Sequence, residues 1–240
     1  MRNRYLTSLG ALALAAALIS LATISTRGQN AAPKTTRQAL PKPGPSPKTA
    51  WGEPDLQGTW FVMESVPLER LIAPACVLDA TDLAGAAEPG QSPIFGRDRV
   101  LRWEREHRPI ERGDAVLLHT GWTDAHYRTG EAGHLYAQAV VDGEATAWAG
   151  LDVEAISLLV ERGVGLFGTD TPSAGPMQEV VDVHRIGLGA GIVYVENLIG
   201  LHQVPATGAW LVFLPLKLVG GSGAPGRAVA LVPREGVGGG

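Results

Sequence analysis

The chain has 240 residues, of which 45% are hydrophobic and 18% are charged, and its formal net charge is −4. This composition is sufficient for a buried core and argues against a nucleic-acid-binding protein, because such proteins carry a basic patch. The single cysteine, Cys76, excludes an internal disulfide, and its apolar neighbours predict a small buried core residue.

The N-terminal residues have the pattern of an export signal. Arg2 and Arg4 precede an apolar core at residues 9–24, which is rich in Leu, Ala and Ile. This core is shorter than the roughly 20 residues that span a bilayer, so residues 1–30 are predicted to be a signal peptide and the protein to be periplasmic or secreted. No stable membrane insertion is expected after cleavage. An uncleaved anchor is the alternative, since no clear cleavage site precedes Gly28.

Residues 31–65 are predicted to lie before the folded domain. Residues 31–48 contain five prolines among Lys and Ser, a composition typical of an extended spacer. Residues 51–60 (WGEPDLQGTW) are a turn-rich stretch bracketed by tryptophans, and they receive no assignment. The folded domain is predicted at residues 66–234, and the glycine-rich tail at residues 235–240 is predicted to be disordered.

Strands and helices alternate within the predicted domain. In the clearest helix, residues 152–162, apolar side chains recur every three or four positions, with Asp152 placed to cap the helix and Gly163 to end it. The predicted strands are residues 75–79, 114–120, 164–168, 192–196, 210–218 and 228–232, and the other predicted helices are residues 97–107 and 180–188. This alternation predicts an α/β (α+β) domain. A Rossmann domain is not expected, because no G-x-G-x-x-G motif follows a strand.

His184 and Glu196 are the candidate site residues with the clearest chemistry. Glu196 ends an apolar predicted strand, where a carboxylate is costly unless a cation, a metal or hydrogen bonds meet it. His184 lies on the preceding predicted helix, and a glycine-rich turn between helix and strand can bring the two side chains together. Imidazole and carboxylate ligands suit zinc or manganese. The alternative is an internal hydrogen bond between them.

Other histidines are expected to have surface or core roles. His119 lies in a predicted strand, and His126 and His134 lie in a predicted loop. His202 follows the strand that Glu196 ends and is expected to be exposed.

Six segments, in order, resemble the motifs of one protein family. Residues 110–122 (IERGDAVLLHTGW) resemble the GD-x-VLL-x-TGW strand of the cyclase family, which contains the bacterial kynurenine formamidases and isatin hydrolases. The other five are PLERL at 67–71, GTDTPS at 168–173, the HR and ENL segments that contain His184 and Glu196, PLK at 215–217 and PGRA at 225–228. On these motifs the chain is identified as a member of that family.

The resemblance implies a fold, an activity and a site. The family fold is a compact, β-rich, swivelling β/β/α domain, assembled as homo-oligomers. Its members hydrolyse amide or lactam C–N bonds of small molecules, such as N-formylkynurenine in tryptophan catabolism, with a bound divalent metal that polarises the carbonyl and activates water. His184 and Glu196 match two family metal ligands. Asp170 and Ser173 are expected to support the site, Asp170 by hydrogen bonds within its loop.

The chain departs from the family upstream of these motifs. The family motif H-x-G-T-H-x-D-x-P-x-H supplies the other metal ligands and an acid/base histidine. The nearest match, residues 56–62 (LQGTWFV), retains only Gly58 and Thr59, so no catalytic residue is assigned. Two hypotheses follow. The protein is a metal-dependent amide hydrolase of the arylformamidase type, or it is an inactive relative with a binding or structural role.

The missing segment also has a consequence for the fold. Part of the sheet is expected to be uncovered, with exposed apolar surface or an unpaired strand edge. Oligomerisation or packing of residues 51–60 onto the gap would cover it.

Overall fold

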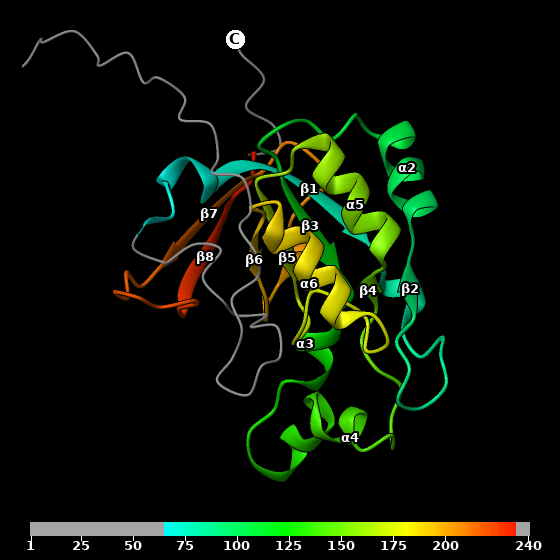
Figure 1. Ribbon diagram of the computed structural model, residues 1–240. Coiled ribbons are helices and arrows are strands. Elements are labelled where there is room, and N and C mark those ends of the chain that lie inside the picture. Colours follow the sequence, from blue (N-terminus) through cyan, green and yellow to red (C-terminus); the bar gives the residue numbers. More distant parts are fainter. Residues whose placement is uncertain (1–64, 234–240) are drawn as a thin grey trace, which may run out of the picture. The chain divides into compact units, whose positions relative to one another are not determined.

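A single curled sheet organises the fold, which the computed structural model describes for residues 65–233 (Figure 1). Its six strands lie in the order β6-β5-β3-β1-β7-β8. The strands are β1 (Ile72–Asp79), β3 (Ala115–His119), β5 (Leu166–Thr169), β6 (Val193–Val195), β7 (Trp210–Pro215) and β8 (Gly226–Leu231). The first four are parallel, and β7 and β8 join β1 as an antiparallel pair. The predicted signal peptide, the linker up to residue 64 and the glycine tail lie outside the described residues.

Helices cover one side of the parallel strands. Figure 1 shows α2 (Arg97–Glu106), α5 (Val153–Arg162) and α6 (Val180–Gly189) on that side, with α3 (Trp122–His126) and α4 (Gln138–Val141) forming a small lobe beyond the strand ends. The short pair β2 (Ile94–Phe95) and β4 (Gly150–Leu151) lies beside α5. The described residues also include the 3₁₀ helices η2 (Leu68–Arg70), η3 (Thr81–Leu83), η4 (Gly130–Tyr136) and η5 (Leu201–Gln203). The predicted α/β class is confirmed.

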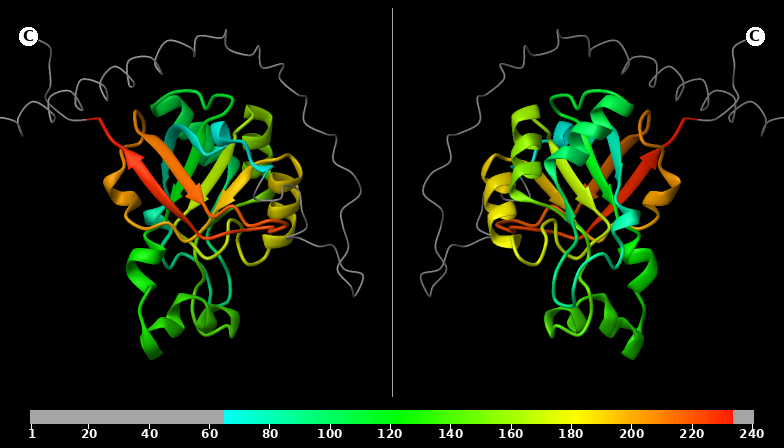
Figure 2. Two further views of the ribbon diagram at one scale, coloured as in Figure 1. Left: turned by 90° about the vertical axis from the view of Figure 1, so that its left-hand side faces the viewer. Right: turned by 90° about the vertical axis from the view of Figure 1, so that its right-hand side faces the viewer.

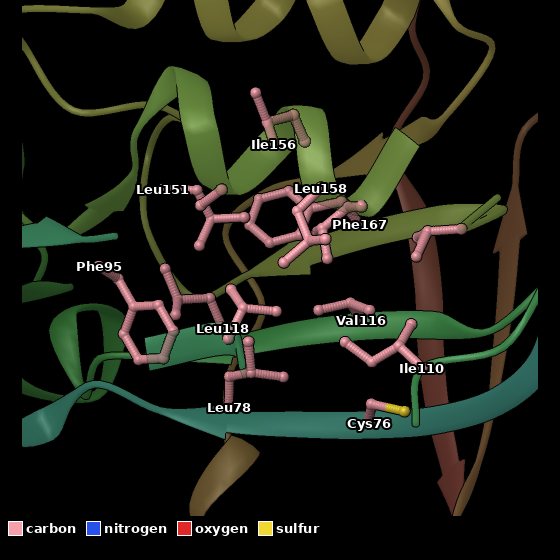
Figure 3. Packing of buried hydrophobic residues seen from close by; sticks show 14 of the residues in the cluster. Cys76, Leu78, Phe95, Ile110, Val116, Leu118, Leu151, Ile156, Leu158 and Phe167 are labelled. Carbon is pink, nitrogen blue, oxygen red and sulfur yellow. The ribbon is translucent and has the colours of Figure 1, made fainter. Parts of the chain in front are cut away.

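Two hydrophobic clusters pack on the two faces of the sheet. The larger cluster fills the space between the strands and α5, where Leu118 and Phe167 meet Ile156 and Leu158 (Figure 3). Cys76 belongs to this cluster and is fully buried, as its neighbours predict. Burial, with the nearby Asp114 carboxylate, raises the pKa of the Cys76 thiol to about 12, so the thiol stays protonated.

Most predicted elements agree with the structure, and their ends differ for local reasons. The helix at Val153–Arg162 begins where the Asp152 carboxylate accepts a bond from the Ala155 amide, and it ends at Gly163 with φ +75°. The strand predicted to reach residue 218 ends at Pro215, where the chain turns towards β8. The expectation of a loop around His126 and His134 is wrong. His126 ends α3 and His134 lies in η4, elements too short to show a hydrophobic repeat.

The hairpin of β7 and β8 gives the sheet its curl. Figure 2 shows the hairpin running obliquely to the parallel strands, away from the helices that cover them. Within residues 65–233, β6 and β8 are the two edge strands, and no strand pairs with the outer side of either. No helix in the same range is long and apolar enough to cross a bilayer.

Candidate functional site

Polar side chains gather where the parallel strands end. Asp79 ends β1, Thr120 follows β3, Asp170 follows β5 and Glu196 follows β6. Because these strands are parallel, their carboxyl ends lie along one edge of the sheet, which is where open α/β sheets bind ligands.

Close packing of α6 on β6 brings His184 to Glu196. A side chain at Gly187 would collide with the hydroxyl of Tyr194, so only glycine allows this approach. The Tyr194 hydroxyl donates to the carbonyl of Val183 at 2.8 Å and holds the helix on the strand. As a result, His184 Nε2 lies 3.3 Å from Glu196 Oε1, with both side chains partly buried.

The contacts of His184 define its protonation. Its Nδ1 lies 2.7 Å from the carbonyl oxygen of Val180, which can only accept, so Nδ1 carries a hydrogen. In the neutral ring Nε2 is then a bare acceptor facing the Glu196 carboxylate. Two bare acceptors at this distance would repel each other, so the contact requires a proton or a bound cation between them. A carbonyl partner at the far nitrogen is also the usual arrangement of a metal-binding histidine.

Without a metal, His184 is expected to titrate above the ordinary histidine value. Burial lowers its pKa, but the hydrogen bonds to Glu196 and to the Val180 carbonyl, together with the Glu196 charge, outweigh burial and raise the pKa above 6.5. NMR titration of metal-free protein should place the pKa of His184 above that of His126, whose pKa is lowered by burial and by Arg128. Glu196→Gln should lower the pKa of His184.

The same shift predicts the direction of a stability change with pH. A histidine whose pKa is raised by folding stabilises the fold fully below its unfolded pKa of about 6.5, and this contribution is lost as pH rises through the folded pKa. Glu196→Gln should therefore reduce the free energy of unfolding more at pH 5.5 than at pH 9. An equal loss at both pH values in urea titrations would show that the pair shares no proton.

Asp170 joins the ends of β3 and β5. Its carboxylate is 1% exposed and accepts from the amide and hydroxyl of Thr120, at 2.9 and 2.7 Å, and from the amide of Gly121 at 2.7 Å. The Thr123 hydroxyl donates to the backbone carbonyl of Asp170 at 2.5 Å. These bonds direct the carboxylate to the loop after β3, so Asp170 positions backbone at the edge of the sheet.

Ser173 lies close to the pair but is not activated. Its hydroxyl oxygen is buried and has no hydrogen-bond partner among the described residues. A serine nucleophile needs a base within hydrogen-bonding distance, so the structure gives no support for a serine hydrolase. The next residue, Ala174, donates its amide to Glu196 Oε1 at 2.9 Å and so connects the Ser173 loop to the pair.

A groove of about 1460 Å³ contains these side chains. His184, Glu196 and Ser173 lie on one wall, and Phe213 and Arg227 of the β7–β8 hairpin contribute to the other. Sequence reasoning missed the wall from the hairpin, because these residues lie far from His184 along the chain. It also missed Asn197 in the lining, whose φ of +61° is the one positive value of a non-glycine residue in the described range.

The described residues offer two candidate metal ligands. No group of three His, Cys, Asp or Glu side chains within residues 65–233 could hold a metal ion. His184 and Glu196 have suitable donor atoms, and the His184 tautomer leaves Nε2 available. The ligand types therefore fit a divalent ion, whereas the number of ligands falls short of the three protein ligands of a typical catalytic zinc site.

A second pair of polar side chains lies outside the groove lining. His202 is exposed, as expected, and its Nδ1 is 3.1 Å from Asp124 Oδ2. The ring of His119 lies 6.5 Å from that of His202. His119 and His202 thus lie near each other and do not contact the His184–Glu196 pair.

Comparisons with known proteins agree with the motifs. A family described as "Putative cyclase" matches residues 22–176, a range that ends before α6. Isatin hydrolase of Roseibium aggregatum is 33% identical over 176 residues, and kynurenine formamidase of Salinibacter ruber is 31% identical over 170 residues. These matches cover 71% and 69% of this chain but only 64% and 66% of the two relatives.

The fold is also shared with a solved structure. An isatin hydrolase bound to the product analogue thioisatinate superposes with a TM-score of 0.63 at 25% identity. The superposition covers 73% of this chain and 66% of that protein. The chain therefore spans just under two thirds of the length of the relatives it matches.

Proposed function

The chain belongs to the cyclase family, and from this membership we propose that it hydrolyses C–N bonds in small amides or lactams, with low turnover. The observation that carries the proposal is the His184–Glu196 pair in a groove, within a fold that matches isatin hydrolase. N-formylkynurenine and related aryl amides are the substrates we propose, because the relatives it matches are named isatin hydrolase and kynurenine formamidase.

The groove has the chemistry that such a substrate needs. Apolar side chains, among them Phe213 and Leu198, can contact an aromatic ring, and His184 and Glu196 lie at the polar end, where they can share one proton when no metal is bound. That proton can be given to a leaving nitrogen, and the Glu196 carboxylate can accept one from water. The Arg227 guanidinium, which lines the groove, is a donor available to substrate oxygen atoms.

We propose zinc or manganese as the cofactor, held by His184 and Glu196. When bound, such an ion polarises a substrate carbonyl and lowers the pKa of water. Two protein ligands are expected to hold it weakly.

Calorimetric titration of metal-free protein with Zn²⁺ is expected to show weak Zn²⁺ binding that depends on His184. Loss of a residue that merely orients a ligand weakens metal binding about 10–100-fold, so His184→Ala should weaken it by more than about tenfold. His134→Ala is the matched control, because His134 is exposed and does not line the groove. Tight binding of one ion that survives His184→Ala would contradict the assignment of the pair.

An inactive relative with a binding or structural role is the second candidate. The lack of a third ligand within residues 65–233 favours it, as does the lack of a match to the family's acid/base histidine. Turnover measurements separate the two candidates. We also propose, from the N-terminal pattern and the family resemblance, that the protein is periplasmic or secreted and forms homo-oligomers.

A further inference from the structure

Asn197 lines the groove next to Glu196 and has an uncommon backbone conformation. Its φ is +61°, a region that non-glycine residues seldom adopt and that is found preferentially at active sites and ligand contacts. Two backbone bonds of 3.0 Å hold this turn, from the Asn197 amide to the carbonyl of Thr171 and from the Leu198 amide to the carbonyl of Thr169. The pairing at the end of β6 therefore fixes the point at which the Asn197 side chain meets the groove.

A tyrosine of the small lobe beyond the strand ends orients the Asn197 amide. The Tyr136 hydroxyl donates a hydrogen bond to Asn197 Oδ1, although the two residues are 61 positions apart in the sequence. Tyr136 ends η4, and its backbone carbonyl accepts from the indole Nε1 of Trp122 at 3.0 Å. Its hydroxyl oxygen also lies 3.0 Å from the hydroxyl oxygen of Thr123. Burial raises the pKa of Tyr136, so the phenol keeps its hydrogen at neutral pH.

The other end of this amide is available to a ligand. Because Oδ1 accepts from Tyr136, the group that remains is Nδ2, which has no hydrogen-bond partner within residues 65–233. An amide nitrogen can only donate, so Nδ2 suits an acceptor such as a carbonyl oxygen. The Asn197 side chain is exposed, and a solvated surface asparagine needs no hydroxyl from a distant element to orient it. The contact with Tyr136 therefore indicates that the direction of Nδ2 matters.

We propose that Asn197 binds the carbonyl oxygen of an amide substrate through Nδ2, with Tyr136 as its positioning residue. This inference rests on the proposed function. Asparagine side chains are among the donors that stabilise the negative charge that develops on a carbonyl oxygen in acyl transfer, and a donor oriented in advance needs no reorganisation during the reaction. Asn197 directly follows Glu196, so a carbonyl held by Asn197 lies beside the His184–Glu196 pair.

Binding of formanilide, a simple N-formyl aryl amide, tests the donor without requiring turnover. In ¹H–¹⁵N NMR spectra of the full chain, the side-chain amide resonances of Asn197 should shift as formanilide is added. Asn197→Gly accommodates the positive φ and should raise the Kd about 2–10-fold, which corresponds to the loss of one neutral hydrogen bond. Asn197→Asp keeps an acceptor for Tyr136 but has no donor, and it should raise the Kd at least as much, because a carboxylate repels a carbonyl oxygen.

Tyr136→Phe tests the positioning role, because it removes only the hydroxyl. The Asn197 side-chain amide should become more mobile in ¹⁵N relaxation measurements, and formanilide should bind more weakly than to the wild type. Tyr127→Phe is the matched control, because Tyr127 is exposed and its ring packs edge-on against that of Tyr136. Its hydroxyl has no hydrogen-bond partner within residues 65–233, so this variant should change neither measurement. Similar thermal unfolding of all four variants confirms that they are folded.

Three results would overturn the proposal. They are no binding of formanilide up to its solubility limit, binding that leaves the Asn197 amide resonances unchanged, and a Kd that neither Asn197 variant alters. Turnover is a separate measurement on the same proteins. Binding that depends on Asn197, together with no hydrolysis of N-formylkynurenine, would contradict the proposed function and support Asn197 as a carbonyl-binding residue.

Discussion

With saturating Mn²⁺ or Zn²⁺, the purified protein is expected to hydrolyse N-formylkynurenine at least about 100-fold more slowly than an intact kynurenine formamidase. General acid–base groups contribute about 10²–10⁴-fold in rate, and no residue of this chain matches the family's acid/base histidine. Saturating metal should not restore the rate, because the deficit is in side chains and not in occupancy.

The variant His184→Ala decides between the two candidate functions. A low residual rate that this variant removes, and that His134→Ala retains, supports the hydrolase. A background rate that neither variant changes supports the inactive relative. Turnover equal to that of the intact enzyme and lost in His184→Ala would show that other groups, such as His119, His126, Asp170 or a neighbouring subunit, complete the site.

Replacement of Asp170 by alanine is expected to lower the free energy of unfolding by about 3–5 kcal/mol. The change removes a buried acceptor and leaves the donors of Thr120 and Gly121 unsatisfied. Each hydrogen bond to a charged group contributes about 1.5–3 kcal/mol, and a buried polar group without a partner costs about 1–3 kcal/mol. A domain is typically stable by only 5–15 kcal/mol, so the variant should be close to unfolding.

Urea unfolding followed by circular dichroism measures this loss. Asp182→Ala is the control, because Asp182 is exposed and pairs with Arg185 on the surface of α6 at 2.8 Å. Exposed pairs contribute about 0–1 kcal/mol, so the control should lose little. Similar losses in the two variants would mean that Asp170 does not tie β3 to β5. The loss of stability in Asp170→Asn should lie between the losses in Asp170→Ala and Asp182→Ala, since an amide retains one acceptor oxygen but not the charge.

Local patterns in the sequence were sufficient for most of the elements. The helix at Val153–Arg162 depends on its own apolar repeat, on Asp152 at its start and on Gly163 at its end, all within a few residues. Strands such as β1 and β3 are short apolar runs, and each run predicts a strand without information from the rest of the chain. Hydrogen bonding within helices and alternation along strands repeat over short distances, so the α/β class and the family motifs are visible without a structure.

Part of the candidate site was also predictable. His184 and Glu196 are joined by a short turn, and the sequence indicates that helix and strand pack together. The sequence does not show how closely they pack. That depends on the fit of Gly187 against Tyr194, and the tautomer of His184 depends on its contact with the Val180 carbonyl.

Only the tertiary structure decided what surrounds the pair. The second wall of the groove comes from the hairpin around Phe213 and Arg227, whose approach to α6 follows from the curl of the sheet. The position of β6 at the edge of the sheet within residues 65–233 is equally invisible in the sequence, because it depends on the order in which the strands pair. Secondary structure depends on residues that are neighbours along the chain, whereas a groove forms between segments that only tertiary packing brings together. For this reason, sequence patterns identified the His184–Glu196 pair but not the groove around it.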